Sequence, residues 1–311
     1  MKNVLFATTA LIATAGLASA AEFKMGGDAR LGVIYTDNDA LSSKTEIEQR
    51  MRIVATGIAE TDSGVKLEVR TRWQSNSSEG TNVIAGSAGN AAAGFAVSYE
   101  GLRLDVGSVS DVIDSGDHFS HGGTGVGLTG FIEQNASAGL PASGFGGNTV
   151  DFTTVKVLYK AGDFGVSASY QTDDSTTPSE WQVGAGYSFG AISVGAAVGS
   201  SDDTSIGDFW AAGLSGSAGA FSYNVLVSDT DEANHDVAYG FSGSYAVSSA
   251  TAIQFAFAGG GDDGADEAYG IGASHDLGGG VTLKGGIGRT AGETGALDGF
   301  NKADFGVSFS F

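Results

Sequence analysis

The sequence predicts an all-β fold: a closed, antiparallel, sixteen-stranded β-barrel that crosses a membrane. Sixteen short stretches alternate apolar with small or polar residues, and this period of two places the two kinds of side chain on opposite faces of a strand. No later segment has the roughly 18 consecutive apolar residues of a membrane helix. Behind an export signal, this pattern is typical of a barrel whose apolar face touches lipid.

The alternation is strongest at the C-terminus, where Phe305, Val307, Phe309 and Phe311 alternate with acidic or small residues. The predicted strands lie near residues 23–36, 44–60, 63–76, 90–99, 102–109, 150–160, 163–172, 179–189, 191–200, 206–216, 219–228, 235–246, 250–259, 266–275, 281–290 and 300–311.

The N-terminus predicts a secretory signal peptide over residues 1–20. Lys2 supplies the positive start, an apolar stretch follows, and Ala18-Ser19-Ala20 forms a small-residue cleavage site. The alternative, a membrane-spanning helix, needs a longer apolar stretch. Residues 21–311 are then one domain, a single transmembrane barrel in which residues 110–149 form a constriction loop.

Composition agrees with a closed sheet. The chain has 51 glycines, 2 prolines and no cysteine, so an exported chain must be stable without disulfides. A closed sheet provides that stability by satisfying every backbone group. The net charge of −21 makes nucleic acid an improbable partner.

Two kinds of connection alternate along the chain. Short turns such as Glu100-Gly101 and Gly190-Ala191 alternate with longer acidic connections, as periplasmic turns and external loops do in bacterial barrels. Aromatic residues gather beside the short turns, which predicts an interfacial girdle. The alternative is that these rings form the core of a soluble β-sandwich.

Charged residues on the early strands predict a polar interior. When the apolar face of each strand is taken as lipid-facing, six of the seven arginines point inward on the first five strands. A closed dry core could not hold these charges unpaired, whereas a water-filled channel could. The predicted basic wall consists of Arg30, Arg50, Arg52, Arg70 and Arg72.

One connection breaks the alternation of loop sizes. From about Ser110 to Thr149 no strand is predicted, and ordered loops of this length are usually functional. If the segment folds into the lumen, its acids Asp111, Asp114 and Asp117 face the basic wall and form a constriction with a transverse field. The alternative is an external loop whose acids are only solvated.

Several segments resemble a known family. They are Gly27-Asp28-Ala29-Arg30-Leu31-Gly32-Val33-Ile34-Tyr35, Thr61-Asp62-Ser63-Gly64, the stretch from Gly272 to Gly280, and the final Ala303 to Phe311. With the strand count, they resemble the sixteen-stranded general diffusion porins of Gram-negative outer membranes, the alphaproteobacterial type in particular. The resemblance implies a homotrimer in the outer membrane, a third loop that narrows the pore, and a terminal Phe311 read by the barrel-assembly machinery.

Two short motifs are spelled like catalytic or cofactor sites but lack the context. Gly186-Tyr187-Ser188-Phe189-Gly190 matches a hydrolase nucleophile elbow, yet it ends one strand and turns into another. Gly125-Val126-Gly127-Leu128-Thr129-Gly130 matches a dinucleotide fingerprint, yet no βαβ unit surrounds it. The sequence therefore predicts no enzyme and no cofactor.

Two acidic runs leave a metal site open. Asp229 and Asp231 in one run, and Asp262 and Asp263 in the other, offer the oxygen ligands that calcium prefers. The first run could also bridge lipopolysaccharide through divalent ions. Neither run has calcium-loop spacing, which favours solvated surface charge.

The predicted function is a passive outer-membrane channel for ions and small hydrophilic solutes. The alternatives are a secreted or surface-attached structural β-protein, such as an adhesin or lectin-like sandwich, and an outer-membrane enzyme. An enzyme would need a nucleophile with a base at the rim of the lumen, and the sequence offers none.

Overall fold

The computed structural model describes residues 21–77, 89–90, 92–145, 153–172, 178–292 and 298–311. The predicted leader, residues 1–20, lies outside the described residues, as do residues 146–149 of the predicted constriction loop. The strands are β1 (Glu22–Thr36), β2 (Thr45–Glu60), β3 (Lys66–Asn76), β4 (Gly89–Asn90), β5 (Gly94–Tyr99), β6 (Leu102–Gly107), β7 (Thr154–Ala161), β8 (Phe164–Gln171), β9 (Glu180–Phe189), β10 (Ile192–Ser201), β11 (Asp208–Ala218), β12 (Phe221–Thr230), β13 (His235–Ala246), β14 (Thr251–Asp262), β15 (Ala268–Gly278), β16 (Val281–Arg289) and β17 (Asn301–Ser310).

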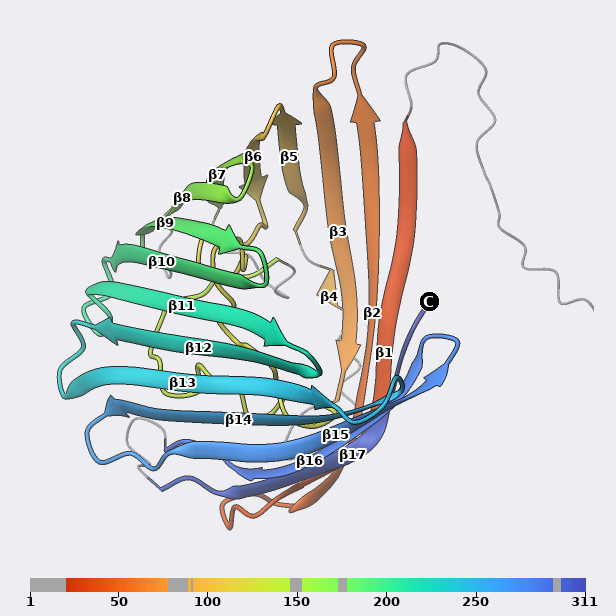
Figure 1. Cartoon of the computed structure of the whole chain (residues 1–311), viewed down its shortest axis with the longest axis vertical. Coiled ribbons are helices and arrows are strands. Elements are labelled where there is room, and N and C mark those ends of the chain that lie inside the picture. The colour runs from red at the N-terminus through yellow and green to blue at the C-terminus, as the bar shows by residue number, and fades with distance from the viewer. Residues whose placement is uncertain (1–20, 78–88, 91, 146–152, 173–177, 293–297) are drawn as a thin grey trace, which may run out of the picture.

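The strands form one closed antiparallel barrel (Figure 1). Each strand pairs with its neighbours in the chain, and β17 returns to pair with β1 from Asp28↔Ser310 to Thr36↔Lys302. The short β4 and β5 both pair with β3, so together they occupy the position of one strand in the barrel. The barrel therefore has sixteen strands, as predicted. Among the described residues, no helix is long and apolar enough to cross a membrane.

Side chains alternate between two environments along each strand. On β17 the ring of Phe305 is 63% exposed, while the adjacent Asp304 is 5% exposed. On β9 Trp181 is 45% exposed and Gln182 is 1% exposed. The apolar residues thus cover the outside of the wall and the polar ones line its inside, the reverse of a soluble protein and the arrangement of a barrel in lipid.

Turn geometry explains the short connections. In the β5–β6 hairpin both turn residues have positive φ, 44° at Glu100 and 86° at Gly101. A two-residue turn of this kind has the twist that joins antiparallel strands directly. Beside the short turns, the rings of Tyr187 and Phe189 lie 4.5 Å apart on the outer surface. Both residues are exposed, so the sandwich-core alternative is wrong for them, and the interfacial girdle stays a prediction.

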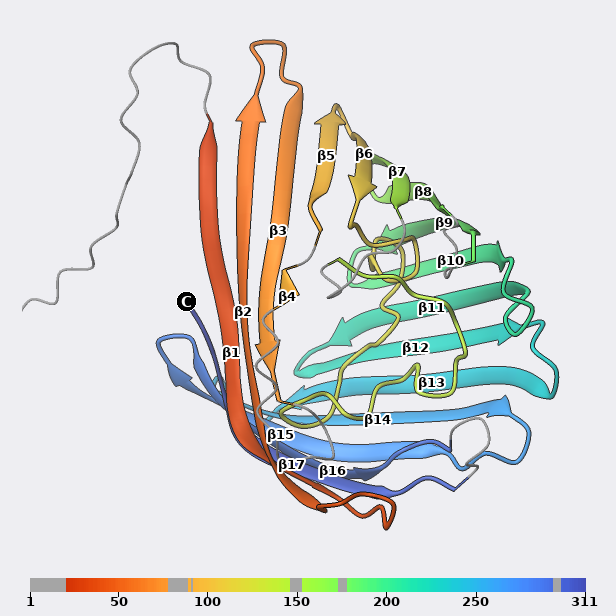
Figure 2. The same cartoon turned by 180° about the vertical axis from the view of Figure 1, so that it is seen from behind.

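The buried apolar residues lie between the wall and the long segment after β6. Val112, Ile113 and Phe119 of that segment pack with residues of β10 to β13, including Phe209 and Leu226. A second cluster joins Val126 and Ile132 to small residues of β14 and β15. In the views from both sides, the trace of this segment runs within the arc of strands (Figure 2).

Candidate functional site: the inner wall of the barrel

The five predicted wall arginines lie side by side on β1, β2 and β3. Arg30 faces Arg50 across the β1–β2 ladder, and Val54 faces Arg72 across the β2–β3 ladder. Their outward neighbours are exposed apolar residues such as Leu31 and Met51. Because side chains alternate at every residue, the arginines share the inner face.

Most of these guanidinium groups have acidic or amide partners on the same wall. Arg30 forms an ion pair with Glu48, and Arg50 pairs with Asp28 at 3.0 Å. Arg52 donates a hydrogen bond to Gln74. These contacts hold long side chains in place, which is how several like charges can be packed within one patch.

Phe145 and Asp114 of the long segment lie near the arginines of β3. The guanidinium carbon of Arg70 lies 4.1 Å from the centre of the Phe145 ring, and that of Arg72 lies 5.9 Å from it. A cation over a ring face is attracted by the ring quadrupole. The carboxylate of Asp114 interacts electrostatically with both arginines. Asp114 thus lies within electrostatic range of this wall, and its role in a constriction stays a prediction.

Asp111 does not face the arginines, and the prediction for this residue is wrong. It is 2% exposed and accepts hydrogen bonds from the backbone N–H groups of Ser143, at 2.5 Å, and Asp114, at 2.7 Å. Burial raises the pKa of Asp111 to about 6, and these hydrogen bonds oppose that shift. Asp111 therefore ties the two ends of the segment together, and its carboxylate is shielded from the lumen by burial.

Asp117 also has a different partner from the one predicted. Its carboxylate lies 2.9 Å from the ammonium group of Lys156 and 3.1 Å from that of Lys160, both on β7. Burial acts to raise the pKa of Asp117, but the lysine hydrogen bonds outweigh it and lower the pKa below its usual value. The lysines were not among the predicted site residues, although their inward and near-turn positions on β7 would have indicated them.

Hydrogen bonds to inward-facing side chains hold the long segment to the wall. The anchors on the wall come from four different strands, and none was predicted as a site residue. They pair Ile113 with Gln182 at 2.9 Å, His118 with Ser167 at 2.6 Å, Thr124 with Ser242 at 2.8 Å and Leu128 with Asp304 at 2.8 Å. A polar residue at an inward position of a strand was the available signal.

Phe311 closes the barrel through its backbone. Its N–H donates to the carbonyl of Gly27 at 3.0 Å, and its carbonyl accepts from the Gly27 N–H at 2.9 Å. The ring is 61% exposed on the outer surface. This position is compatible with the predicted assembly signal, which stays a prediction.

The acidic runs meet at the rim of the barrel around a histidine. The Nδ1 atom of His235 lies 3.7 Å from Asp229, and His235 faces Asp262 across the β13–β14 ladder. Within the described ranges, no group of three histidine, aspartate or glutamate side chains is placed to hold a metal ion. Calcium at Asp229, Asp231, Asp262 and Asp263 stays a prediction.

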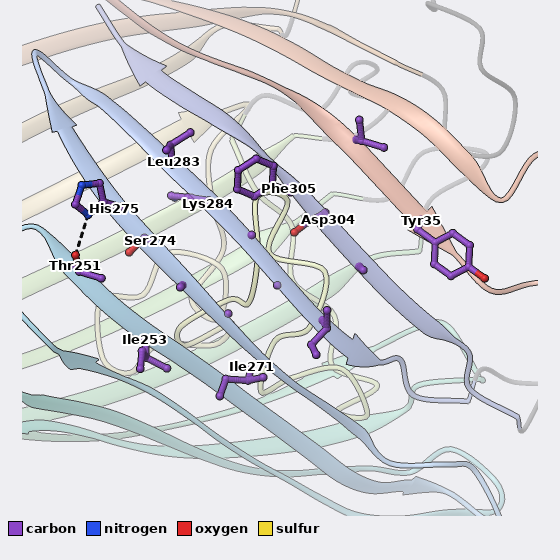
Figure 3. Close-up of a pocket in the computed structure, with 17 residues that line it drawn as sticks. Tyr35, Thr251, Ile253, Ile271, Ser274, His275, Leu283, Lys284, Asp304 and Phe305 are labelled. Atoms are coloured by element: carbon purple, nitrogen blue, oxygen red, sulfur yellow. Dashed lines mark hydrogen bonds between the residues drawn. The ribbon is translucent and has the colours of Figure 1, made fainter.

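A large hollow lies on the outside of the wall, away from the charged lumen. It lies over β14 to β17 and β1 (Figure 3). Its volume is about 770 Å³. Its lining includes the small residues Ala273, Gly285 and Ala303 and the larger Ile253 and Phe305. An apolar hollow on this face belongs to the outer surface and has no part in the lumen.

Comparisons with known proteins agree with this geometry. The family described as "Gram-negative porin" matches residues 7–295. A porin from Fuscovulum blasticum is 29% identical over 317 residues, covering 93% of this chain and all of the relative. Two solved structures of Rhodopseudomonas blastica porin, a triple mutant and a second engineered variant, superimpose with TM-scores of 0.76 at 23% and 24% identity. Each covers 93% of this chain and all of the other chain, and they support the fold.

A closed barrel with lipid-facing apolar residues and a charged interior defines a transmembrane channel. The chain belongs to the Gram-negative porin family. It is an outer-membrane channel for small solutes, and the adhesin alternative has no support.

Proposed function

We propose that the channel sorts small hydrophilic solutes by size and charge at a constriction between β3 and the segment 110–145. The observation that carries this proposal is the contact of Phe145 with Arg70, 4.1 Å from ring centre to guanidinium carbon. The negative charge of Asp114 lies near enough to Arg70 and Arg72 to interact with both electrostatically. Opposed charges across a narrow passage create a transverse field that favours small polar solutes over larger apolar ones.

Planar-bilayer recording tests the constriction. Purified protein should form channels whose conductance is lowered by sugars small enough to enter the pore. Sugars above a sharp cut-off size should leave the conductance unchanged, because they are excluded. Replacing Phe145 by alanine should raise both the conductance and the cut-off size, because the ring occupies space beside the arginines. An unchanged cut-off in F145A would place the narrowest point elsewhere.

We further propose a homotrimer that assembles through the outer face of β1 to β3. The outer face of these strands carries Gln49, Thr71 and Ser75 among its apolar residues, at ladder positions that alternate with inward arginines. Polar groups are costly against lipid and are better placed against another protein surface. The chain has no cysteine, so S75C should be joined between subunits by a bifunctional thiol reagent, whereas V225C on β12 should not.

The same proposal includes removal of residues 1–20 on export and recognition of Phe311 during assembly. The small residues before Ala21 support cleavage there, and the intact mass of the purified protein tests it. Deleting Phe311 should reduce assembled barrel far more than deleting Ser201 of the external rim. Equal yields would leave Phe311 with only its role in pairing to Gly27.

A further inference from the structure

The inner surface of β15, β16, β17 and β1 carries a bed of glycines on which the tip of the long segment rests. A Cβ atom at Gly286 would lie 2.7 Å from Val126, and one at Gly306 would lie 2.7 Å from Leu128. Val126 is fully buried there, and Ile132 is 1% exposed. The glycines that make this space are Gly270, Gly272, Gly286, Gly288, Gly306 and Gly32.

Asp304 is the charged residue within this glycine bed. It is 5% exposed and lies on β17, facing inward next to the outward Phe305 (Figure 3). One carboxylate oxygen accepts from the backbone N–H of Leu128 at 2.8 Å. The other accepts from the backbone N–H and the hydroxyl of Thr129, each at 2.8 Å. Three donors on one carboxylate compensate its burial, as a buried charge requires.

The Gly125–Gly130 stretch, which is spelled like a dinucleotide fingerprint, supplies these donors. Gly127 has a φ of +87°, a conformation that glycine adopts without strain. A Cβ at Gly127 would lie 2.2 Å from the Asp304 carboxylate. The glycine therefore lets the backbone approach closely enough to donate two successive N–H groups. Its backbone approaches a carboxylate of the barrel wall instead of a phosphate.

We propose that Asp304 is a positioning residue that latches the tip of the segment to the barrel wall and thereby sets the width of the pore. The latch rests on the proposed function, because the tip, residues 126–132, belongs to the same segment as Asp114 and Phe145. Leu128 and Asp304, which the hydrogen bond joins, are 176 residues apart in sequence. The latch therefore also ties the segment to the strand that closes the barrel. Releasing the tip would leave the segment held by its other wall contacts alone.

Thiol reactivity reads the latch directly in a chain that has no natural cysteine. V126C should be protected from a water-soluble maleimide in refolded, detergent-purified protein. Adding Asp304→Ala should raise its labelling rate at least tenfold, and Asp304→Asn should have an intermediate effect because an amide keeps one acceptor. Ser308→Ala, two positions further along the inner face of β17 from Gly306, is the matched control.

Conductance of the same variants separates the latch from the constriction. In Asp304→Ala with Val126 intact, we expect larger and noisier openings, and the heat-modifiable barrel band should be unchanged. Faster labelling with unchanged conductance would overturn the role in the pore and count against the constriction, while the docking itself would stand. Unchanged labelling of V126C in Asp304→Ala would overturn the latch, whatever the constriction does.

Discussion

The inner faces of β2–β3 and of β15–β16 follow the same alternation along the strand, but they carry different kinds of side chain. The first carries long charged side chains, including Arg50, Arg52, Arg70 and Arg72, and the second carries mostly glycine and other small residues. Charged side chains face the lumen, where water can solvate them and where wall acids pair with Arg30 and Arg50. The long segment touches Arg70 and Arg72 through the ring of Phe145. Glycines lie where the long segment packs against the wall, because any side chain would occupy its place. The inner wall is thus divided between a solvated half and a packed half.

The largest effect should come from a side chain introduced into the packed half. In Gly286→Val the new Cβ would meet Val126 at 2.7 Å and the backbone of Gly127 at 2.9 Å. We expect the tip to be displaced, with a large rise in conductance or a sharp loss of assembled barrel, since backbone cannot yield as a side chain can. Semi-native electrophoresis and bilayer recording measure the two outcomes.

Arg52→Val is the matched change in the solvated half. It also places a valine on the inner face, but no packed segment opposes it among the contacts of Arg52, whose hydrogen bond goes to Gln74. Its assembly should match the parent. If both substitutions reduced barrel assembly equally, the glycines would not be needed to make room for the long segment.

The sequence was sufficient for the barrel because alternation is a local signal. Most strands repeat it, and the predicted segments coincide with the observed strands within a few residues. The partners of Asp111 and Asp117 could not be read in the same way. They depend on how an irregular segment packs against the inner wall, and no period relates Asp117 to Lys156 across 39 residues. The high glycine content was visible in the composition. Which glycines make room for the tip could not be predicted, because that depends on how residues 126–132 pack against the wall.

Charge removal on the solvated side should have the next largest effect. Replacing Arg70 and Arg72 by serine should shift selectivity toward cations, because Asp114 would lose the charges that oppose it. Asp114→Asn should shift selectivity toward anions. Both shifts are measured as reversal potentials in a salt gradient, and the barrel should remain stable because lumen positions tune selectivity.

Asp111→Asn is the discriminating control for that pair. Its carboxylate is buried and hydrogen-bonded within the segment, so neutralising it should leave the reversal potential near that of the parent. If Asp111→Asn shifts selectivity as much as Asp114→Asn, the carboxylate of Asp111 faces the lumen after all.

A smaller effect should appear in the pH dependence of the segment. The pKa of Asp111 is raised by burial to about 6 in the folded protein, so folding favours its neutral form. The stabilisation is then fully present below the ordinary carboxyl pKa of about 4 and is lost as pH rises toward 6. Amide hydrogen exchange over residues 108–115 should be slower at pH 4 than at pH 7 after correction for the intrinsic rate.

The Asp111→Asn variant is the control and should remove that difference. A difference that persists in the variant would come from another group, such as Glu133, whose pKa is also raised by burial.

The smallest effect should come from the outer face, where the two halves of the wall also differ. Gln49 and Ser75 stand on the outside of β2 and β3, while the outward positions of β12 include Val225 and Val227. If β1–β3 form the subunit contact, Gln49→Leu removes a polar contact between subunits and should lower the dissociation temperature of the trimer by a few degrees.

If this face touched lipid instead, the same change would remove a polar group from hydrocarbon and stabilise the barrel. Heating series on semi-native gels therefore give opposite signs for the two arrangements. Val225→Leu, which is apolar before and after, is the control and should leave the dissociation temperature unchanged.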